Sequence, residues 1–179
     1  GTSSWEQLGS DIDGEAAGDK SGSSVALSSD GTIIAIGANE EEPTMMESGY
    51  VRVYQWRKYT QEDQNNETYH YTSQIQHSEP EPEPQFKPLI ITASNETAPI
   101  VGTSYWTQLG SDIDGEAAGD QFGHSVALSS DGTRVVIGAF ENNGNGSYSG
   151  HVRVYQYDQQ SDIWTQLGDD IDGEAGGDR

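Results

Sequence analysis

The fold is decided by Trp106-Thr-Gln-Leu-Gly-Ser-Asp-Ile-Asp-Gly-Glu-Ala-Ala-Gly-Asp120, a stretch that occurs three times in the chain. Related copies run from Trp5 to Asp19 and from Trp164 to Asp178. The tryptophans that open the first and second copies are 106 − 5 = 101 residues apart, whereas those that open the second and third are 164 − 106 = 58 residues apart. The chain is therefore a tandem repeat of about sixty residues, with an insert in its first unit.

The uninterrupted unit, 106–163, shows the alternation and turn residues of short antiparallel strands. Asp131-Gly132 supplies the positive φ angles that a tight hairpin needs. The apolar run 133–139 does not alternate cleanly, which predicts a strand buried on both faces. No helical periodicity is present in the repeats. The strands predicted in this unit, and at the start of the next, are 106–110, 124–130, 133–139, 151–157 and 163–168.

Each unit therefore predicts one four-stranded sheet with two apolar faces that it cannot bury alone. Stacking copies face to face buries them, either around an axis as a propeller or along a line as a solenoid. The expected fold is all-β, built from tandem four-stranded antiparallel blades of a β-propeller or of a propeller-like β-repeat array. The chain supplies about two such blades. The tryptophans at 5, 106 and 164 are the expected aromatic anchors between blades.

The predicted organisation has four parts. These are a terminal strand with an acidic loop (1–21), a first blade that carries the insert (22–112), a second blade (113–171) and the start of a further repeat (172–179). The strand expected at Trp5 has no blade of its own in front of it. The chain is therefore interpreted either as an excerpt of a longer array or as a protomer that associates, that strand adding to a neighbour's open edge.

The insert, 57–105, is polar and holds five of the six prolines. Glu79-Pro-Glu-Pro-Glu-Pro84 predicts an extended polyproline-type segment. Segments 69–75 and 86–92 each have the composition of a strand. Two interpretations stay open at this point, a glycosylated loop and a β-hairpin that extends from the edge of the blade.

Charge and composition point to an extracellular protein. Eight basic residues against thirty acidic ones give a net charge of −22, which argues against nucleic acid as a partner. No apolar run is long enough for membrane insertion. There are no cysteines. Three Asn-x-Ser/Thr sequons, at Asn66, Asn95 and Asn145, fall in loop-like sequence and predict glycosylation at the cell surface or outside the cell.

Two short motifs carry a family resemblance. Phe122-Gly123 opens one strand of a hairpin, and Gly138-Ala139-Phe140 closes the other. This pattern resembles the FG-GAP repeat, the blade of integrin α-like β-propellers. The equivalents in the first unit, Ser21-Gly22 and Gly37-Ala38-Asn39, match less well. The longer repeated motif is similar to tandem arrays in large predicted surface proteins of aquatic microbes. The resemblance implies a propeller-type fold over nearly everything except the insert.

Many FG-GAP blades bind calcium through an Asp-x-Asp-x-Asp-Gly loop in that hairpin. Here the hairpin turns hold only Asp30-Gly31 and Asp131-Gly132, so the family's calcium site cannot be carried over to them.

The acidic loop of the repeated motif is a metal candidate on its own. Carboxylates at loop positions one, three, five and nine follow the way in which a chain wraps a hard cation, and calcium is the cofactor expected there. The alternative is a structural turn in which Asp side chains accept hydrogen bonds from nearby backbone amides. The candidate ligands are Asp11, Asp13, Glu15 and Asp19; Asp112, Asp114, Glu116 and Asp120; and Asp170, Asp172, Glu174 and Asp178.

The remaining charged groups favour structure over catalysis. Arg52 and Arg153 occupy the same place in Val-Arg-Val-Tyr strands, and each is predicted to form an ion pair between blades. The histidines, at 70, 77, 124 and 151, show no metal spacing and are interpreted as surface or strand-end residues. No catalytic constellation stands out, so the chain is predicted not to be an enzyme.

Two functions follow. The first is a structural or adhesive extracellular β-repeat protein that assembles, with copies of itself or with flanking repeats, through blade stacking or strand addition into a surface structure or filament. The alternative is a binding module that presents its loops and the insert to a glycan or protein ligand.

Overall fold

The computed structural model describes residues 4–39, 48–65 and 101–177. It separates into two compact units, residues 1–56 with 106–179 and residues 57–105. In the described parts of the chain, all regular structure is β except for a helical turn at 61–65. The predicted all-β class is therefore confirmed.

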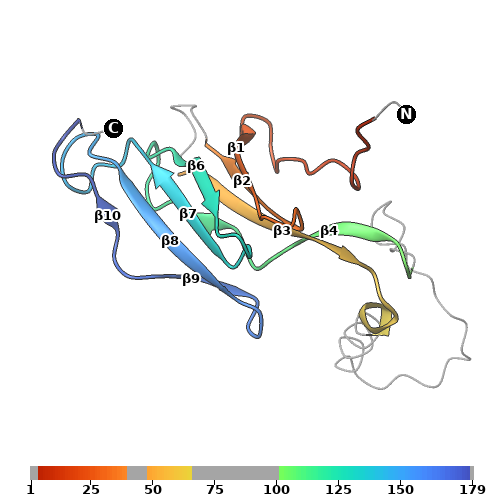
Figure 1. Ribbon diagram of the computed structural model, residues 1–179. Coiled ribbons are helices and arrows are strands. Elements are labelled where there is room, and N and C mark those ends of the chain that lie inside the picture. The colour runs from red at the N-terminus through yellow and green to blue at the C-terminus, as the bar shows by residue number, and fades with distance from the viewer. Residues whose placement is uncertain (1–3, 40–47, 66–100, 178–179) are drawn as a thin grey trace, which may run out of the picture. The chain divides into compact units, whose positions relative to one another are not determined.

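Each repeat forms its own antiparallel sheet (Figure 1). In the first sheet the order is β1-β2-β3-β4, and β5 also pairs with β3. In the second sheet the order is β10-β8-β7-β6, and β9 also pairs with β8. The first sheet consists of β1 (Ser21–Leu27), β2 (Ile33–Ala38), β3 (Tyr50–Lys58), β4 (Ser104–Gln108) and β5 (Ile113–Asp114). The second consists of β6 (Phe122–Leu128), β7 (Arg134–Ala139), β8 (His151–Asp158), β9 (Ile163–Gln166) and β10 (Ile171–Asp172). The two sheets share one connectivity, as expected for two blades.

The two-residue strands β5 and β10 lie inside stretches expected to be loops. β5 pairs with Tyr50 and Val51, so the first sheet reaches Asp114, two residues past the expected boundary. β10 pairs with β8 in the same way. The Ile-Asp step of the second and third acidic loops thus joins the sheet of the preceding repeat.

The strand expected at Trp5 is not formed. Residues 4–8 have no regular structure and Trp5 is fully exposed. The equivalent stretches, β4 and β9, pair with β3 and β8, the strands that precede them in the chain. The first copy has no such strand before it in the described part of the chain, so its backbone has nothing to pair with.

The core lies between the two sheets, where β6 lies against β1 and β2 (Figure 1). One face of the first sheet, here called its inner face, contributes Ala35, Val51 and Val53. The inner face of the second sheet contributes Val135, Ile137, Ala139 and Tyr155. Each large apolar side chain buried in this way contributes roughly 1.5–3 kcal/mol, so the stacking of blades stabilises the fold.

Residues at the same or nearly the same place in the two repeats also touch through polar contacts. The Ser29 amide and hydroxyl both donate to the Ser130 carbonyl oxygen, at 3.0 and 2.9 Å. The Ser24 hydroxyl donates to the Gly123 carbonyl oxygen at 2.6 Å. The second repeat is thus stacked on the first almost in register.

The strand at 133–139, which is β7, is expected to be buried on both faces, but one of its faces is partly exposed. Its counterpart in the first repeat, β2, is buried on both faces. Ala35 of β2 is fully buried because it faces the second sheet. Val136, at the same place in β7, is 38% exposed. The opposite side of the second sheet, its outer face, is therefore partly uncovered.

The β6–β7 hairpin turn holds an aspartate with a strongly lowered pKa. The Asp131 carboxylate accepts hydrogen bonds from the Ser129 hydroxyl at 2.6 Å and from the Thr133 amide and hydroxyl, both at 3.0 Å. The Ser129 hydroxyl, followed by the Thr133 groups, lowers the pKa of Asp131 to about 2. These bonds stabilise the short Asp-Gly turn.

We expect the side-chain carboxyl of Asp131 to titrate at about 2 when followed by NMR between pH 5 and 1.5. Because the pKa in the folded state lies below the unfolded value, its contribution to stability is present above that unfolded value. The contribution is lost as the pH falls through the folded pKa. A midpoint near 3.8, the ordinary value, would contradict the turn geometry.

The described ends of the insert are tied together within their own unit. The Tyr59 amide donates to the Thr103 carbonyl oxygen at 2.8 Å, and the Tyr59 and Tyr105 rings meet edge to face at 5.9 Å. Thr60 and Asp63 cap the helical turn by reciprocal hydrogen bonds. The segments 69–75 and 86–92 and the polyproline stretch lie outside the described residues. No helix in the described part of the chain is long and apolar enough to cross a membrane.

Candidate functional site

The tryptophan of the repeated motif joins each copy to the one before it. The Trp106 indole nitrogen donates to the Leu8 carbonyl oxygen at 2.9 Å, and that of Trp164 donates to the Leu109 carbonyl oxygen at 2.8 Å. Each ring also packs on an aromatic side chain of the strand beside it. Trp106 lies 5.3 Å from Trp56, and Trp164 lies 5.1 Å from Tyr157. The predicted role of these tryptophans as anchors between repeats is confirmed for Trp106 and Trp164.

The glutamine of the motif fixes the first acidic residue of its loop. The Gln7 amide donates to Asp11 at 2.8 Å, and the Gln166 amide donates to Asp170 at 2.8 Å. In the middle copy the Gln108 amide donates to Asp112 at 2.6 Å. All three copies therefore shape the start of the acidic loop in the same way.

Two arginines link consecutive acidic loops. Arg52 makes a bidentate contact with Asp112, at 3.0 and 2.9 Å, and also pairs with Glu15 of the preceding loop. Arg153 makes the equivalent contact with Asp170, at 2.8 and 2.7 Å, and also pairs with Glu116. The predicted ion pairs are confirmed, and each joins two loops.

These ion pairs control the charge of their carboxylates. Hydrogen bonds from Arg153 are the largest cause that lowers the pKa of both Glu116 and Asp170. Both carboxylates are therefore ionised at neutral pH. Because Glu116 is about half exposed, the strength of its pair is reduced by water.

The last aspartate of the first two loops is buried and accepts hydrogen bonds from the protein. Asp19 accepts hydrogen bonds from the Ala16 amide at 2.7 Å and from the Tyr50 hydroxyl at 2.9 Å, and the Ala16 bond chiefly lowers its pKa. Asp120 accepts a hydrogen bond from the Asn142 amide at 2.7 Å. The Ala16 bond to Asp19 is of the kind that the structural-turn alternative expects.

Predicted ligands meet across loops more than within one loop. Glu15 and Asp19 of the first loop line one hollow with Asp112 and Asp114 of the second. Desolvation, followed by the charges of Asp112 and Glu15, raises the pKa of Asp114. Asp13, Asp172 and Glu174 are exposed, and Asp178 lies outside the described residues. Calcium binding by the loops stays a prediction.

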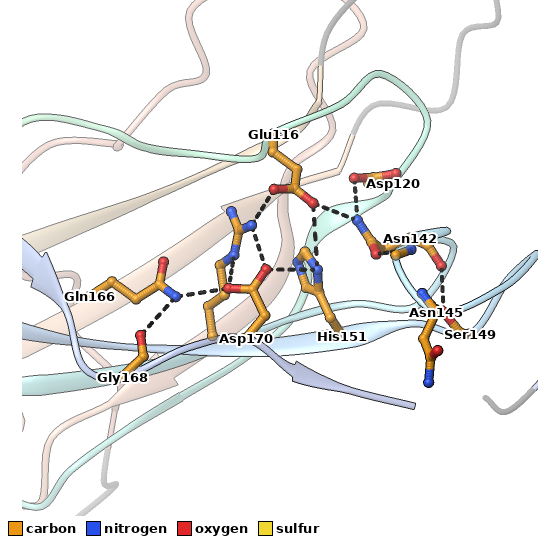
Figure 2. Close-up of polar contacts among 11 residues, drawn as sticks. Glu116, Asp120, Asn142, Asn145, Ser149, His151, Gln166, Gly168 and Asp170 are labelled. Carbon is orange, nitrogen blue, oxygen red and sulfur yellow. Dashed lines mark hydrogen bonds and ion pairs between the residues drawn. The ribbon is translucent and has the colours of Figure 1, made fainter. Parts of the chain in front are cut away.

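Within the described residues, the group of acidic and histidine side chains close enough to share an ion is Glu116, His151 and Asp170. Figure 2 shows His151 pointing between the two carboxylates, which come from different loops. His151 lies at the start of β8, as interpreted, but it is buried. One feature of the sequence could have indicated this site: His151 stands where the first repeat has Tyr50.

Among the three sequon asparagines, Asn145 lies in the described part of the chain. It is exposed, and its side-chain amide donates to the carbonyl oxygens of Gly173 and Glu174, at 2.9 and 3.3 Å. Glycosylation there stays a prediction, and Asn66 and Asn95 lie outside the described residues.

Two stacked antiparallel sheets of one connectivity, joined by a repeated loop, define a tandem β-repeat protein with blades of the propeller type. Residues 112–155, most of which lie in the second sheet, match the family model for the FG-GAP repeat. The family is a generally non-enzymatic one. No curated protein and no solved structure matches the chain.

Proposed function

We propose that this chain is a non-enzymatic, extracellular structural protein whose end faces bind a second copy of itself, head to tail, by the same stacking that joins its own two repeats. The observation that carries this proposal is that each half of the internal interface is present a second time, uncovered, at an end of the stack. Such a contact between different faces builds a ring where it closes and a filament where it does not.

The outer face of the second sheet repeats the inner face of the first. Val152 and Val154 stand where the first sheet has Val51 and Val53, and Val136 stands where it has Ala35. The three residues in the first sheet are buried, whereas their counterparts are partly or clearly exposed. An apolar face of this kind is typical of a protein interface.

The outer face of the first sheet supplies the complementary half. Val25 and Leu27 of β1 are 61% and 59% exposed. Their counterparts in β6, Val126 and Leu128, pack against the core between the sheets. A second copy would cover Val25 and Leu27 as the first repeat covers Val126 and Leu128.

The glycine of the motif contacts the tryptophan of the next copy, and at the third copy this contact is left unfilled. A Cβ atom on Gly9 would lie 3.3 Å from Trp106, and one on Gly110 would lie 3.0 Å from Trp164. A Cβ atom on Gly168, the same place in the third copy, would meet nothing within 4 Å. Trp5 is the fully exposed tryptophan that a second copy would bring to Gly168.

A hollow beside β7 and β8 marks the same place. It is lined by Ser125, Gly138, Gly150 and Val152, among others. In the first repeat, the space beside Gly37 and Gly49 is filled by the backbone of Gly123 and Phe122. The backbone of Ser21-Gly22 in a second copy is the equivalent segment.

The test is the molar mass of the chain by light scattering across a range of concentrations. We expect a multimer whose mass rises with concentration, and a monomer when Val136→Asp places a charge on the outer face of the second sheet. Gln160→Asp adds the same charge in the exposed β8–β9 turn and should leave the multimer intact. The unfolding temperature of each variant checks that the fold survives.

A wild-type chain that stays monomeric at every concentration would refute this proposal and leave the alternative, a module that binds a glycan or protein. Repeating the measurement in calcium and in a chelator tests the loops. Collapse of the multimer on chelation would assign calcium to them, and no change would favour their structural role.

A further inference from the structure

The second junction between acidic loops contains a histidine whose nitrogens have no hydrogen-bond partner. His151 is 4% exposed, and both Nδ1 and Nε2 are buried without a partner. One side of its ring meets Phe122 edge to face, with centroids 6.4 Å apart. Leaving a buried polar atom unsatisfied is costly, so this arrangement points to a group that is bound there.

Two carboxylates face the imidazole across a gap. The distance from Nδ1 of His151 to Oδ2 of Asp170 is 3.7 Å, and that to Oε1 of Glu116 is 3.9 Å. Both are too long for a hydrogen bond. Both are also shorter than twice the roughly 2.1 Å bond that zinc makes to nitrogen or carboxylate oxygen. One ligand atom from each of the three side chains lies within 4.8 Å of the other two, close enough for a single ion to be shared among them.

Arginine and amide side chains hold the two carboxylates in place. Arg153 pairs with Oε2 of Glu116 and with both oxygens of Asp170. The Asn142 amide donates to Oε1 of Glu116 at 3.0 Å, and the Gln166 amide donates to Oδ1 of Asp170 at 2.8 Å (Figure 2). Such outer contacts orient metal ligands and reduce the entropy lost when an ion binds.

We propose that Glu116, His151 and Asp170 bind one divalent transition-metal ion, of the kind that zinc represents, at the junction of the second and third acidic loops. The site goes beyond the stacking role proposed above. An imidazole nitrogen with two carboxylates favours zinc and its neighbours over calcium, which prefers oxygen ligands alone. The two carboxylates outnumber the Arg153 cation, and the net charge of −22 also attracts cations.

The first junction shows the same framework without the nitrogen. Glu15, Arg52 and Asp112 repeat the ion pairs of Glu116, Arg153 and Asp170. Tyr50 stands in the place of His151, and its hydroxyl donates to Asp19 instead of facing the two carboxylates. The ion pairs are therefore common to both junctions, and the metal site depends on the histidine.

The test is a titration of the full chain, stripped by a chelator, with Zn²⁺ by calorimetry and with Co²⁺ by visible absorption. We expect one equivalent of either ion and cobalt bands that report a nitrogen ligand. His151→Tyr copies the first junction and should no longer bind that equivalent. Its affinity for zinc should fall by roughly tenfold to a hundredfold or more. His124→Ser copies Ser23, the equivalent residue of the first repeat, and should bind as the wild type does.

Equal zinc binding by the wild type and His151→Tyr, or no binding by the wild type, would overturn the proposal. Glu116→Gln gives a second test that keeps the size of the side chain, and it should also weaken binding. In NMR spectra of the wild type, zinc should shift the Nδ1 resonance of His151. If zinc moves only the resonances of other histidines, the ion is adventitious and the proposal fails.

Discussion

Gly37→Ala is expected to destabilise the fold strongly, because a Cβ atom at position 37 has no room between the two sheets. It would lie closer to the Gly123 carbonyl oxygen than any nonbonded contact allows. That oxygen belongs to the backbone of β6 and already accepts a hydrogen bond from Ser24, so it cannot move aside. We expect a loss of about 3 kcal/mol in the free energy of unfolding, a fall in Tm on the order of 10 °C by calorimetry.

The chain carries its own control for this experiment. Gly138 occupies the same place in β7. A Cβ atom there would meet only Ser125, the equivalent of the Ser24 that a Cβ atom at Gly37 would meet in addition to Gly123. No atom of another repeat is near it. Gly138→Ala should therefore leave Tm within a few degrees of the wild type. Equal losses in the two variants would show that the crowding is local to each hairpin and not between repeats.

Gly138→Ala also tests the proposed assembly, because its methyl group would enter the hollow that a second copy should fill. We expect it to weaken association while it leaves the fold intact.

Much of the fold could be predicted because the evidence for it is local and repeated. Asp131-Gly132 predicts the hairpin turn, and the period-two pattern of 151–157 predicts β8. The strand at Trp5 could not be judged in this way. Its residues match those of β4 and β9, but a strand also needs a partner, and partners are set by position in the stack rather than by sequence. Burial is also set by position in the stack: Val136 of β7 is exposed, although Ala35 at the same place in β2 is buried.

The site could be predicted less well, because its contacts join separate loops. The spacing of Asp112, Asp114, Glu116 and Asp120 suggested one loop around one ion. In the structure, Asp112 pairs with Arg52 and Glu116 pairs with Arg153, on different sheets. The sequence did predict that both arginines form ion pairs. It could not show that His151 faces carboxylates of two loops, since these positions meet only after the repeats stack.

Head-to-tail stacking makes a further prediction that few other modes of association share. Leu27→Asp damages the outer face of the first sheet, and Val136→Asp damages the outer face of the second. Each variant alone should be a monomer, because each lacks one half of the contact. An equal mixture of the two should form a dimer, since the intact face of one variant complements the intact face of the other. The mass by light scattering should then double and go no further.

The doubling would distinguish stacking from other contacts. If each face bound its own kind across a twofold axis, each variant would keep one intact face and dimerise alone. If association came from the insert or from the exposed segment at Trp5 alone, neither substitution would reduce the mass. A mixture that stays monomeric, with both variants folded, would contradict the proposed pairing of Val25 and Leu27 with Val136 and Val154. In the mixed dimer each chain has already used its one intact face. The mixed dimer should therefore stay a dimer at the highest concentration tested.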